Sequence, residues 1–370
     1  MGVIHTMRQK SWLSMMVIAV LAMVVAGCGG NSGSASGGAG NTANTANSPA
    51  ANGGASASPE AGTAAPSASP AAEASVPAVS GPVTVEHVKG TETFESTPQR
   101  VVVLEWSLAE SVLALGIQPV GVADMEGYNN WVKAGADFAP EVVDVGTRQE
   151  PNLEAIMALK PDLILAVDFR SENNYEQLKA IAPTVVFGSE LEENVKSPYT
   201  YMVNTFQTIA QILGKEKEGQ EVLDHMNQSF EAAKQKLKDA GKEGAPFVVT
   251  QAWSDQNAAV MRLFTDNSMA VEVLEQVGLT NAFEPAAFQP NGFETISVEG
   301  LAQVQDANFF YVAQDDDNVF ENQLKDNAVW KSLNFVKENR TYPLGGDMWM
   351  FGGPQSAELL VNKAVELLTK

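Results

Sequence analysis

The sequence predicts an α/β protein with two lobes, each built on a central, mostly parallel sheet flanked by helices, and bridged by one long helix. Short apolar runs alternate with amphipathic segments between residues 100 and 187, which is typical of strands and helices in turn. An unbroken helical pattern then fills 198–213, and a second strand and helix series follows it. The predicted folded part, about 290 residues, is also long for a single hydrophobic core.

The N-terminal segment is predicted to lie outside this fold. Arg8 and Lys10 precede the apolar run "WLSMMVIAVLAMVVAG", the pattern of an export signal, so we assign 1–27 to a signal peptide. The run is too short to span a bilayer comfortably, which disfavours a transmembrane helix. Residues 28–81 are nearly all Gly, Ala, Ser, Asn, Thr and Pro, which predicts a disordered tether.

Cys28 is the only cysteine of the chain, and it ends the segment "VVAGC" at the expected cleavage site. This segment resembles the lipobox of bacterial lipoproteins, in which the cysteine thiol is acylated. The resemblance implies that Cys28 is the lipidation site and that a lipid anchor holds the protein on the extracytoplasmic face of the cell membrane. A single cysteine also excludes an intrachain disulfide.

The N-terminal lobe is predicted to occupy 82–197. It opens with a hairpin in "VTVEHVKGTETFES", followed by five strands in "RVVVLE", "QPVGVAD", "EVVDVG", "PDLILAVD" and "PTVVFG". Helices are expected at 107–115, in "NLEAIMALK" and in "NYEQLKAIA", the second of them capped by Asn152. The ligand crevice of such a sheet lies outside the carboxyl ends of its strands.

The bridging helix is predicted at 198–213, where apolar residues recur at helical spacing, and the C-terminal lobe at 214–370. This lobe is expected to contain a helix at 217–240, strands in "PFVVTQAW", "AAVMRLFT" and "NFFYVAQ", a helix at 267–277 and a terminal helix after Pro354.

Three arginines lie at predicted strand ends. Arg148 follows "DVGT" and Arg170 follows "LILAVDF", while Arg262 in "MRLFTDNS" holds a similar place in the second lobe. A guanidinium offers a planar fork of donors that matches a carboxylate. Each arginine alone is equally well explained by a surface ion pair. Because all three stand at strand ends, in both lobes, the pattern favours an anion-binding site.

Aromatic residues are interleaved with these arginines, and we expect four of them to form the walls of the site: Trp106, Tyr128, Trp253 and Trp349. Tryptophan at a strand end is commonly core packing. Trp349, however, lies in the glycine-flanked loop "GGDMWMFGG", where an aromatic side chain often has a partner.

Charge and composition narrow the function. The formal net charge of -22 disfavours nucleic acid or an anionic membrane surface as the partner of the folded body. His5, His87 and His225 are not paired at metal-ligand spacing, so no protein metal site is expected and an axial haem ligand is disfavoured. The chain lacks a nucleophile motif and a P-loop, so we expect no enzyme. A bound metal would arrive already chelated.

The motifs "RVVVLEWSLAESVLALGIQPVGVAD", "VDVGTRQEPNLEAIMALKPDLILA", "TDNSMAVEVLEQVGLTNAF" and "GDMWMFGGPQSA" resemble those of the substrate-binding lipoproteins of bacterial iron(III)-siderophore ABC importers, the iron-dicitrate-like branch. The similarity covers about residues 82–370, in the same order in both lobes. It is greatest to Gram-positive members that take up ferric complexes of citrate-based hydroxamate or carboxylate siderophores.

The resemblance implies a monomeric receptor without a cofactor, whose ligand is a preformed Fe(III)-siderophore chelate or ferric citrate. Arginines would hold its peripheral carboxylates and aromatic side chains its apolar arms. The resemblance also implies an ABC permease as partner, with Glu154 and Glu299 as the residues that dock into it. Without the resemblance, each glutamate is an ordinary acid at a helix start.

Three other functions stay open from the residues. The first is a corrinoid or haem receptor of the same fold, and the second is a surface hydrolase on an α/β scaffold. The third is a structural cell-wall protein, which an uncharged cleft would favour.

Overall fold

The computed structural model describes residues 81–189 and 196–370, which belong to one compact unit. The predictions for 1–27, for Cys28 and for the tether up to residue 80 lie outside the described residues. Within the described ranges, no helix combines the length and the apolar composition needed to cross a membrane.

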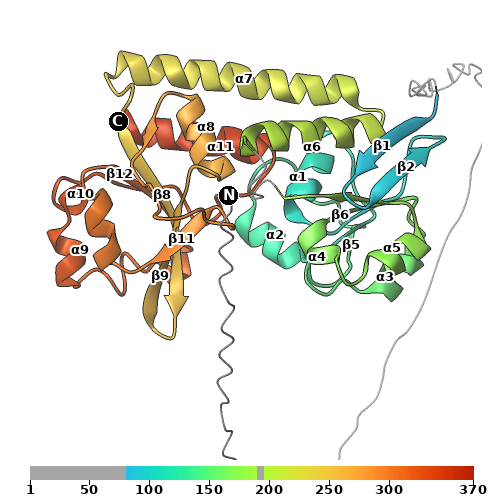
Figure 1. The fold of residues 1–370 in the computed structure, drawn as a ribbon, viewed down its shortest axis with the longest axis horizontal. Coiled ribbons are helices and arrows are strands. Elements are labelled where there is room, and N and C mark those ends of the chain that lie inside the picture. Colours follow the sequence, from blue (N-terminus) through green and yellow to red (C-terminus); the bar gives the residue numbers. More distant parts are fainter. Residues whose placement is uncertain (1–80, 190–195) are drawn as a thin grey trace, which may run out of the picture. The chain divides into compact units, whose positions relative to one another are not determined.

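The N-terminal lobe carries the predicted hairpin and a five-stranded, fully parallel sheet of order β5-β4-β3-β6-β7 (Figure 1). Every residue of the two central strands β3 and β6 is buried, which explains their unbroken apolar sequences. The strands are β1 (Val83–His87), β2 (Gly90–Phe94), β3 (Val101–Val103), β4 (Gly121–Val122), β5 (Val143–Asp144), β6 (Leu163–Val167) and β7 (Thr184–Phe187). The helices are α1 (Trp106–Ala114), α2 (Met125–Trp131), α3 (Leu153–Ala158), α4 (Asp168–Ser171) and α5 (Tyr175–Ile181).

The C-terminal lobe has a six-stranded mixed sheet of order β11-β9-β8-β12-β13, with β10 also paired to β8. Its strands are β8 (Pro246–Asp255), β9 (Ala258–Phe264), β10 (Thr280–Asn281), β11 (Phe293–Ile296), β12 (Asn308–Val312) and β13 (Thr341–Pro343). The pairs β8–β12, β12–β13 and β8–β10 are parallel, whereas β8–β9 and β9–β11 are antiparallel. Gln256 and Asn257, with φ of 47° and 67°, form a two-residue turn that folds β9 back along β8.

The helical segments of this lobe are α8 (Met269–Gln276), η1 (Glu299–Val304), η2 (Asp315–Asp317), α9 (Ala328–Ser332), α10 (Asn334–Lys337) and α11 (Pro354–Leu368). Together with the two sheets they confirm the predicted α/β fold class.

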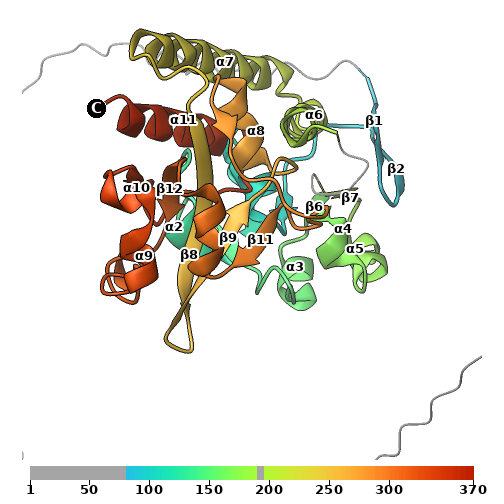
Figure 2. The ribbon, with the colours of Figure 1, turned by 60° about the vertical axis from the view of Figure 1, so that its left-hand side comes forward.

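Two consecutive helices, α6 (Pro198–Ile212) and α7 (Glu216–Asp239), connect the lobes. α6 begins beside the C-terminal lobe, where the Ser197 hydroxyl and the Tyr199 backbone N–H donate to the Glu272 carboxylate of α8 at 2.6 and 2.7 Å. α6 also contacts α1 and β1 of the N-terminal lobe, and α7 lies along both α6 and α11 (Figures 1 and 2). The domain boundaries drawn at 197/198 and 213/214 stay predictions.

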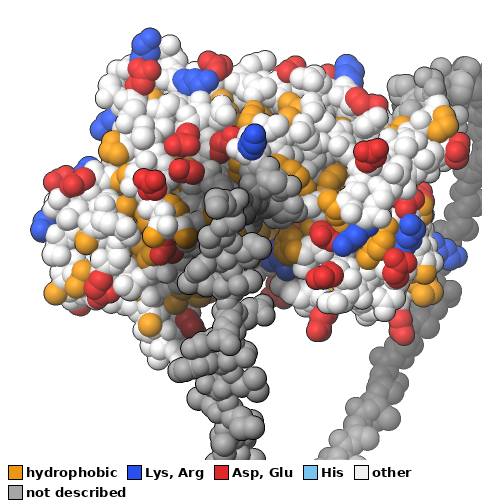
Figure 3. All heavy atoms as spheres, in the orientation of Figure 1, with side chains coloured by type: hydrophobic (Ala, Val, Ile, Leu, Met, Phe, Trp, Pro, Cys, Tyr) orange, Lys and Arg blue, Asp and Glu red, His pale blue; other side chains and the backbone are white. Residues whose placement is uncertain are grey.

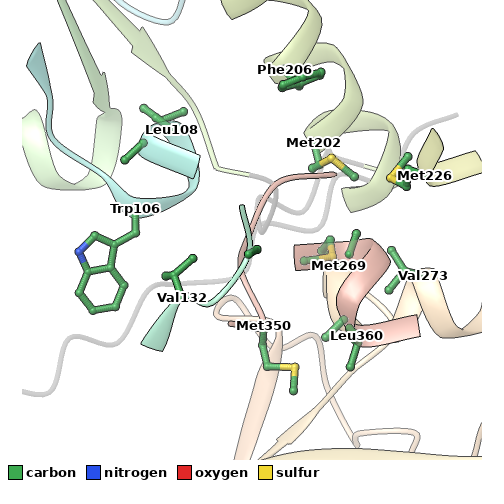
Figure 4. Close-up of a cluster of buried hydrophobic side chains, with 14 of the residues drawn as sticks. Trp106, Leu108, Val132, Met202, Phe206, Met226, Met269, Val273, Met350 and Leu360 are labelled. Carbon is green, nitrogen blue, oxygen red and sulfur yellow. The ribbon is translucent and has the colours of Figure 1, made fainter. Parts of the chain in front are cut away.

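One hydrophobic core extends through both lobes. Its members include Leu108 of α1, Phe206 of α6, Met226 of α7, Met269 of α8 and Leu360 of α11, all buried (Figure 4). Burying such side chains contributes roughly 1.5–3 kcal/mol each. The shared core therefore connects the two lobes by apolar contacts.

Glu110 of α1 adds a polar connection inside this core. Its carboxylate, which is completely buried, accepts hydrogen bonds from the Gly353 N–H at 3.0 Å, the Ser356 N–H at 2.8 Å and the Ser356 hydroxyl at 2.6 Å. These donors lie at the N-terminus of α11, whose first N–H groups have no partner within the helix. A residue of the N-terminal lobe thus caps a helix of the C-terminal lobe.

Candidate ligand-binding site

A cleft of about 370 Å³ lies between the lobes and is lined by residues of both. The N-terminal lobe contributes Glu105, Arg148, Phe169 and Arg170, among others, and the C-terminal lobe contributes Arg262, Phe293, Trp349 and Phe351. A second hollow of about 420 Å³ lies beside the β1–β2 hairpin and α6, but no arginine lines it. The cleft is therefore the candidate site for an anion.

The order of the strands explains which charged residues meet at the N-terminal wall. Arg148 follows β5, Asp124 follows β4, Glu105 follows β3, and Arg170 lies in α4 directly after β6. These strands are neighbours in the order β5-β4-β3-β6, so their carboxyl ends bring the four side chains together. Along this edge the two acids, Asp124 and Glu105, lie between the two arginines.

Glu105 connects the two arginines of this wall. One carboxylate oxygen accepts from Arg148 Nη1 at 2.7 Å and the other from Arg170 Nε at 2.5 Å. The carboxylate also accepts from the Trp106 N–H at 2.9 Å, which caps the start of α1. Only 8% of the Glu105 side chain is exposed, so water competes little for these bonds.

Arg148 lies at the floor of the cleft. Its guanidinium carbon is 3.4 Å from the centre of the Trp106 ring and 5.7 Å from that of Trp349. Its Nε lies 3.4 Å from the Asp124 carboxylate, and 11% of its side chain is exposed. Stacking and two acids therefore hold Arg148 in place, and Nη2 is its one nitrogen without a partner among the described residues.

Arg262 faces this wall from the C-terminal lobe. Its guanidinium carbon is 4.5 Å from the ring centres of both Trp253 and Phe293. It makes no ion pair and no side-chain hydrogen bond with any residue in 81–189 or 196–370. Burial lowers the pKa of Arg262, but a guanidinium stays charged at neutral pH. A partly buried cation is thus left without a counter-ion at the cleft.

Aromatic rings complete the lining. Phe351 lies 5.3 Å from Trp349 and 6.4 Å from Phe293, measured between ring centres, and all three rings line the C-terminal side. Phe169 lines the opposite side next to Arg170 and is 61% exposed. An exposed ring of this size at a cleft is a candidate ligand contact.

The predicted aromatic walls are placed differently from one another. Trp349 lines the cleft, whereas Trp106 lies beneath Arg148 and is 3% exposed, with its Nε1–H donating to the Asp124 carbonyl at 3.0 Å. Trp253 contacts Arg262 from β8 and is not among the lining residues. Tyr128 lies in the core, 2% exposed against Phe138, because α2 turns it inward from the cleft.

The two predicted docking glutamates are both exposed. Glu154 is in the first turn of α3, where the Asn152 side chain caps the helix by accepting from the Glu154 and Ala155 N–H groups at 3.1 Å. Glu299 is the first residue of η1, and a hydrogen bond from Ser297 lowers its pKa. Their role in docking stays a prediction.

Glu105 and Phe169 are site residues that the sequence analysis missed. Like the arginines, both lie within a few residues of the end of a buried strand. Glu105 is the last residue of the predicted strand "RVVVLE", and an acid does not by itself suggest an anion site. Phe169 adjoins Arg170 at the end of an apolar sequence, where an aromatic residue is equally typical of the core.

No group of three or more His, Cys, Asp or Glu side chains that could hold a metal ion occurs among the described residues. Neither His87, in the β1–β2 hairpin, nor His225 of α7, whose Nδ1 lies 3.0 Å from the Glu358 carboxylate of α11, lines the cleft. The chemistry of the cleft is thus that of arginines and aromatic rings. On the face seen in Figure 3, by contrast, acidic side chains are spread over both lobes.

The sequence of this chain is similar to those of known proteins. The Fe(3+)-citrate-binding protein YfmC of Bacillus subtilis is 34% identical over 271 residues, which are 73% of this chain and 81% of that protein. The putative ABC transporter substrate-binding lipoprotein YhfQ of the same species is 30% identical over 72% of this chain and 82% of its own length.

A solved structure agrees with these relatives. The Fe3+-Desferal-bound siderophore-binding protein FhuD from Vibrio cholerae matches with a TM-score of 0.65 and 32% identity, covering 73% of this chain and 98% of that chain. The family model described as periplasmic binding protein matches residues 101–348, which include the cleft-lining residues from Glu105 to Phe293 but not Trp349 and Phe351. This chain belongs to the periplasmic binding protein family.

Proposed function

We propose that this protein is a membrane-anchored extracytoplasmic receptor that binds an anionic ferric siderophore or ferric citrate in the interlobe cleft and delivers it to an ABC permease for iron uptake. The observation that carries the proposal is that Arg148, Arg170 and Arg262, from two lobes of an acidic protein, line one cleft. Relatives named for Fe(3+)-citrate and siderophore binding support a ferric chelate as the ligand.

The free edges of the arginines favour a ligand that carries carboxylates. Arg170 bonds Glu105 through Nε alone, so its two terminal nitrogens have no partner among the described residues. Arg262 has all its donors free in the same sense. A carboxylate accepts two parallel bonds from such an edge, and each charged hydrogen bond contributes about 1.5–3 kcal/mol. A chelate with carboxylates on opposite sides would bridge the lobes.

The siderophore itself would supply all the iron ligands, so the protein needs neither a cofactor nor a metal site of its own. A cleft of about 370 Å³ is of the size that small-molecule sites have. Phe169, Phe293 and Phe351 would contact the apolar arms of the chelate. We further propose that binding involves no chemical conversion of the ligand.

The proposal also includes a lipid anchor at the N-terminus and a contact between the folded body and the permease. Cys28 would carry the lipid, as the lipoprotein name of YhfQ supports, and residues 28–81 would tether a monomeric body to the membrane. Glu154 and Glu299, one exposed at each lobe, would dock into the permease. Removing either charge would then weaken delivery without changing ligand affinity.

Titration of intrinsic tryptophan fluorescence tests the ligand class, because Trp349 lines the cleft and Trp106 lies beneath it. Ferric citrate or a ferric citrate-based siderophore is expected to quench the emission with one-to-one stoichiometry. Citrate without iron serves as one control and Arg262→Ala as another. Quenching only by haem or by cobalamin would favour the alternative receptor, and turnover of the chelate in product analysis would favour a hydrolase.

A further inference from the structure

We infer that Glu105 is a positioning residue of the cleft, which holds Arg148 and Arg170 in the orientation that presents their remaining N–H groups to the ligand. The inference rests on the proposed function, because it concerns how the site recognises an anionic chelate. It assigns a role in anion binding to a negatively charged side chain.

The geometry fixes Glu105 from three directions. Its two oxygens serve different arginines, Arg148 at 2.7 Å and Arg170 at 2.5 Å, and the Trp106 N–H donates to it at 2.9 Å. Since the side chain is 92% buried and caps α1, moving it away would break both ion pairs and the cap. A ligand carboxylate therefore adds to this arrangement and does not replace Glu105.

The guanidinium nitrogens that Glu105 engages determine which N–H donors remain for the ligand. Glu105 accepts from Nε of Arg170, and the end of that guanidinium, Nη1 and Nη2, has no partner within 81–189 and 196–370. On Arg148 it takes Nη1, Asp124 takes Nε, and Nη2 remains. Glu105 and Asp124 thus accept from Nε and Nη1 of Arg148 and from Nε of Arg170. The remaining N–H donors of both guanidinium groups are available to a molecule in the cleft.

Charge balance explains why an acid is needed. Arg148 and Arg170 against Glu105 and Asp124 add up to a formal charge of zero on the N-terminal wall, whereas Arg262 has no acidic partner among the described residues. Without Glu105 the two guanidinium groups would repel each other in a poorly solvated space and turn apart. The site would gain net positive charge and lose the alignment of its donors.

A matched pair of variants separates alignment from charge. Glu105→Gln removes one negative charge and puts an amide N–H₂ against one arginine. Asp168→Asn removes the same charge two residues before Arg170, where Asp168 pairs with Lys89 and not with an arginine. We expect Glu105→Gln to weaken ferric citrate binding at least tenfold and Asp168→Asn to change it less than twofold.

A double-mutant cycle shows whether Glu105 acts through the arginine. In an Arg170→Ala background, Glu105→Gln should weaken ferric citrate binding less than threefold further, because one of the two guanidinium groups that Glu105 positions is gone. A full tenfold loss in that background, or unchanged or tighter binding in the single variant, would overturn the inference.

Phenylglyoxal, which modifies guanidinium groups, gives a readout that needs no ligand. Mass spectrometry should show Arg170 modified several times faster in Glu105→Gln than in the parent protein. Arg340, which pairs with Glu338 and does not line the cleft, serves as the internal reference. Equal rates would overturn the inference even if no ferric chelate bound, so its failure is distinct from that of the proposed function. If Glu105→Gln does not fold, Glu105→Asp, which is too short to reach both arginines, takes its place in each measurement.

Discussion

Ser356 donates both its backbone N–H and its hydroxyl to Glu110, so that α11 of the C-terminal lobe begins on a buried carboxylate of the N-terminal lobe. Gly352 and Gly353 allow the close approach, because a Cβ on Gly352 would lie 2.7 Å from the same carboxylate. The two lobes are thus joined by a polar contact at the back of the cleft as well as by the connecting helices.

Glu110→Gln should destabilise the protein by about 1–3 kcal/mol, because the amide N–H₂ would meet the N–H donors that now point at a carboxylate oxygen. Urea unfolding at pH 6 measures the change. Glu358→Gln is a control, since this acid is paired with the exposed His225 on the outside. Equal stability of Glu110→Gln and the parent would show that the contact contributes nothing.

The Glu110 contribution should also depend on pH. Burial raises the pKa of this carboxyl above its unfolded value, and the hydrogen bonds from Ser356 and Gly353 act in the opposite direction. The folded state therefore holds the proton more tightly, so the contribution is complete below the unfolded pKa of about 4.3 and is lost as pH rises through the folded pKa. The stability difference between the parent and Glu110→Gln should shrink from pH 4.5 to pH 8, and a constant difference would contradict this.

Arg262→Ala and Arg148→Ala should separate affinity from stability. Arg262 has no acidic partner among the described residues, so its removal should weaken ferric citrate binding about tenfold or more while the free energy of unfolding changes by less than about 1 kcal/mol. Arg148→Ala leaves Glu105 and Asp124 short of a partner and should also destabilise the fold by about 1–3 kcal/mol. Isothermal titration and urea unfolding test both, and a stability loss in Arg262→Ala equal to that in Arg148→Ala would contradict the distinction.

Phe169→Ala should lower ligand affinity by about 1–2 kcal/mol with little effect on stability, because the ring lines the cleft while 61% of the residue is exposed. Phe288→Ala is the matched control, since Phe288 is 44% exposed but does not line the cleft. Calorimetric titration compares the ligand affinities of the two variants. Similar affinities would mean that the ligand does not contact Phe169.

Tyr128→Phe should leave both affinity and stability within about 1 kcal/mol of the parent. The Tyr128 hydroxyl is buried without a hydrogen-bond partner among the described residues, so removing it relieves an unsatisfied group. Thermal unfolding and the same titration measure the two quantities. A clear loss of affinity would show that Tyr128 contributes to the ligand site, as predicted from the sequence.

Periodic segments were predictable from the sequence, whereas most contacts between distant segments were not. The buried strands β3 and β6, the helix pattern from Met202 to Ile209 and the capping residue Asn152 each follow from local sequence. The meeting of Arg148 and Arg170 also followed, because carboxyl ends of parallel strands share one edge.

The partners of those arginines depend on strand order, which local pattern does not give. Glu105 and Asp124 lie between them only because β3 and β4 lie between β6 and β5. Tyr128 could not be placed for a similar reason: α2 is short, and which of its sides faces inward depends on the tertiary packing against Phe138.

The continuous core limits how such a receptor can diversify. Because side chains from both halves, such as Leu108 and Leu360, are buried in one cluster, neither half retains a complete interior when separated from the other. Exchange of whole halves between relatives would disrupt many contacts at once. New ligand preferences are therefore expected to arise by single substitutions just after the carboxyl ends of the strands, where a change of side chain leaves the hydrophobic core intact.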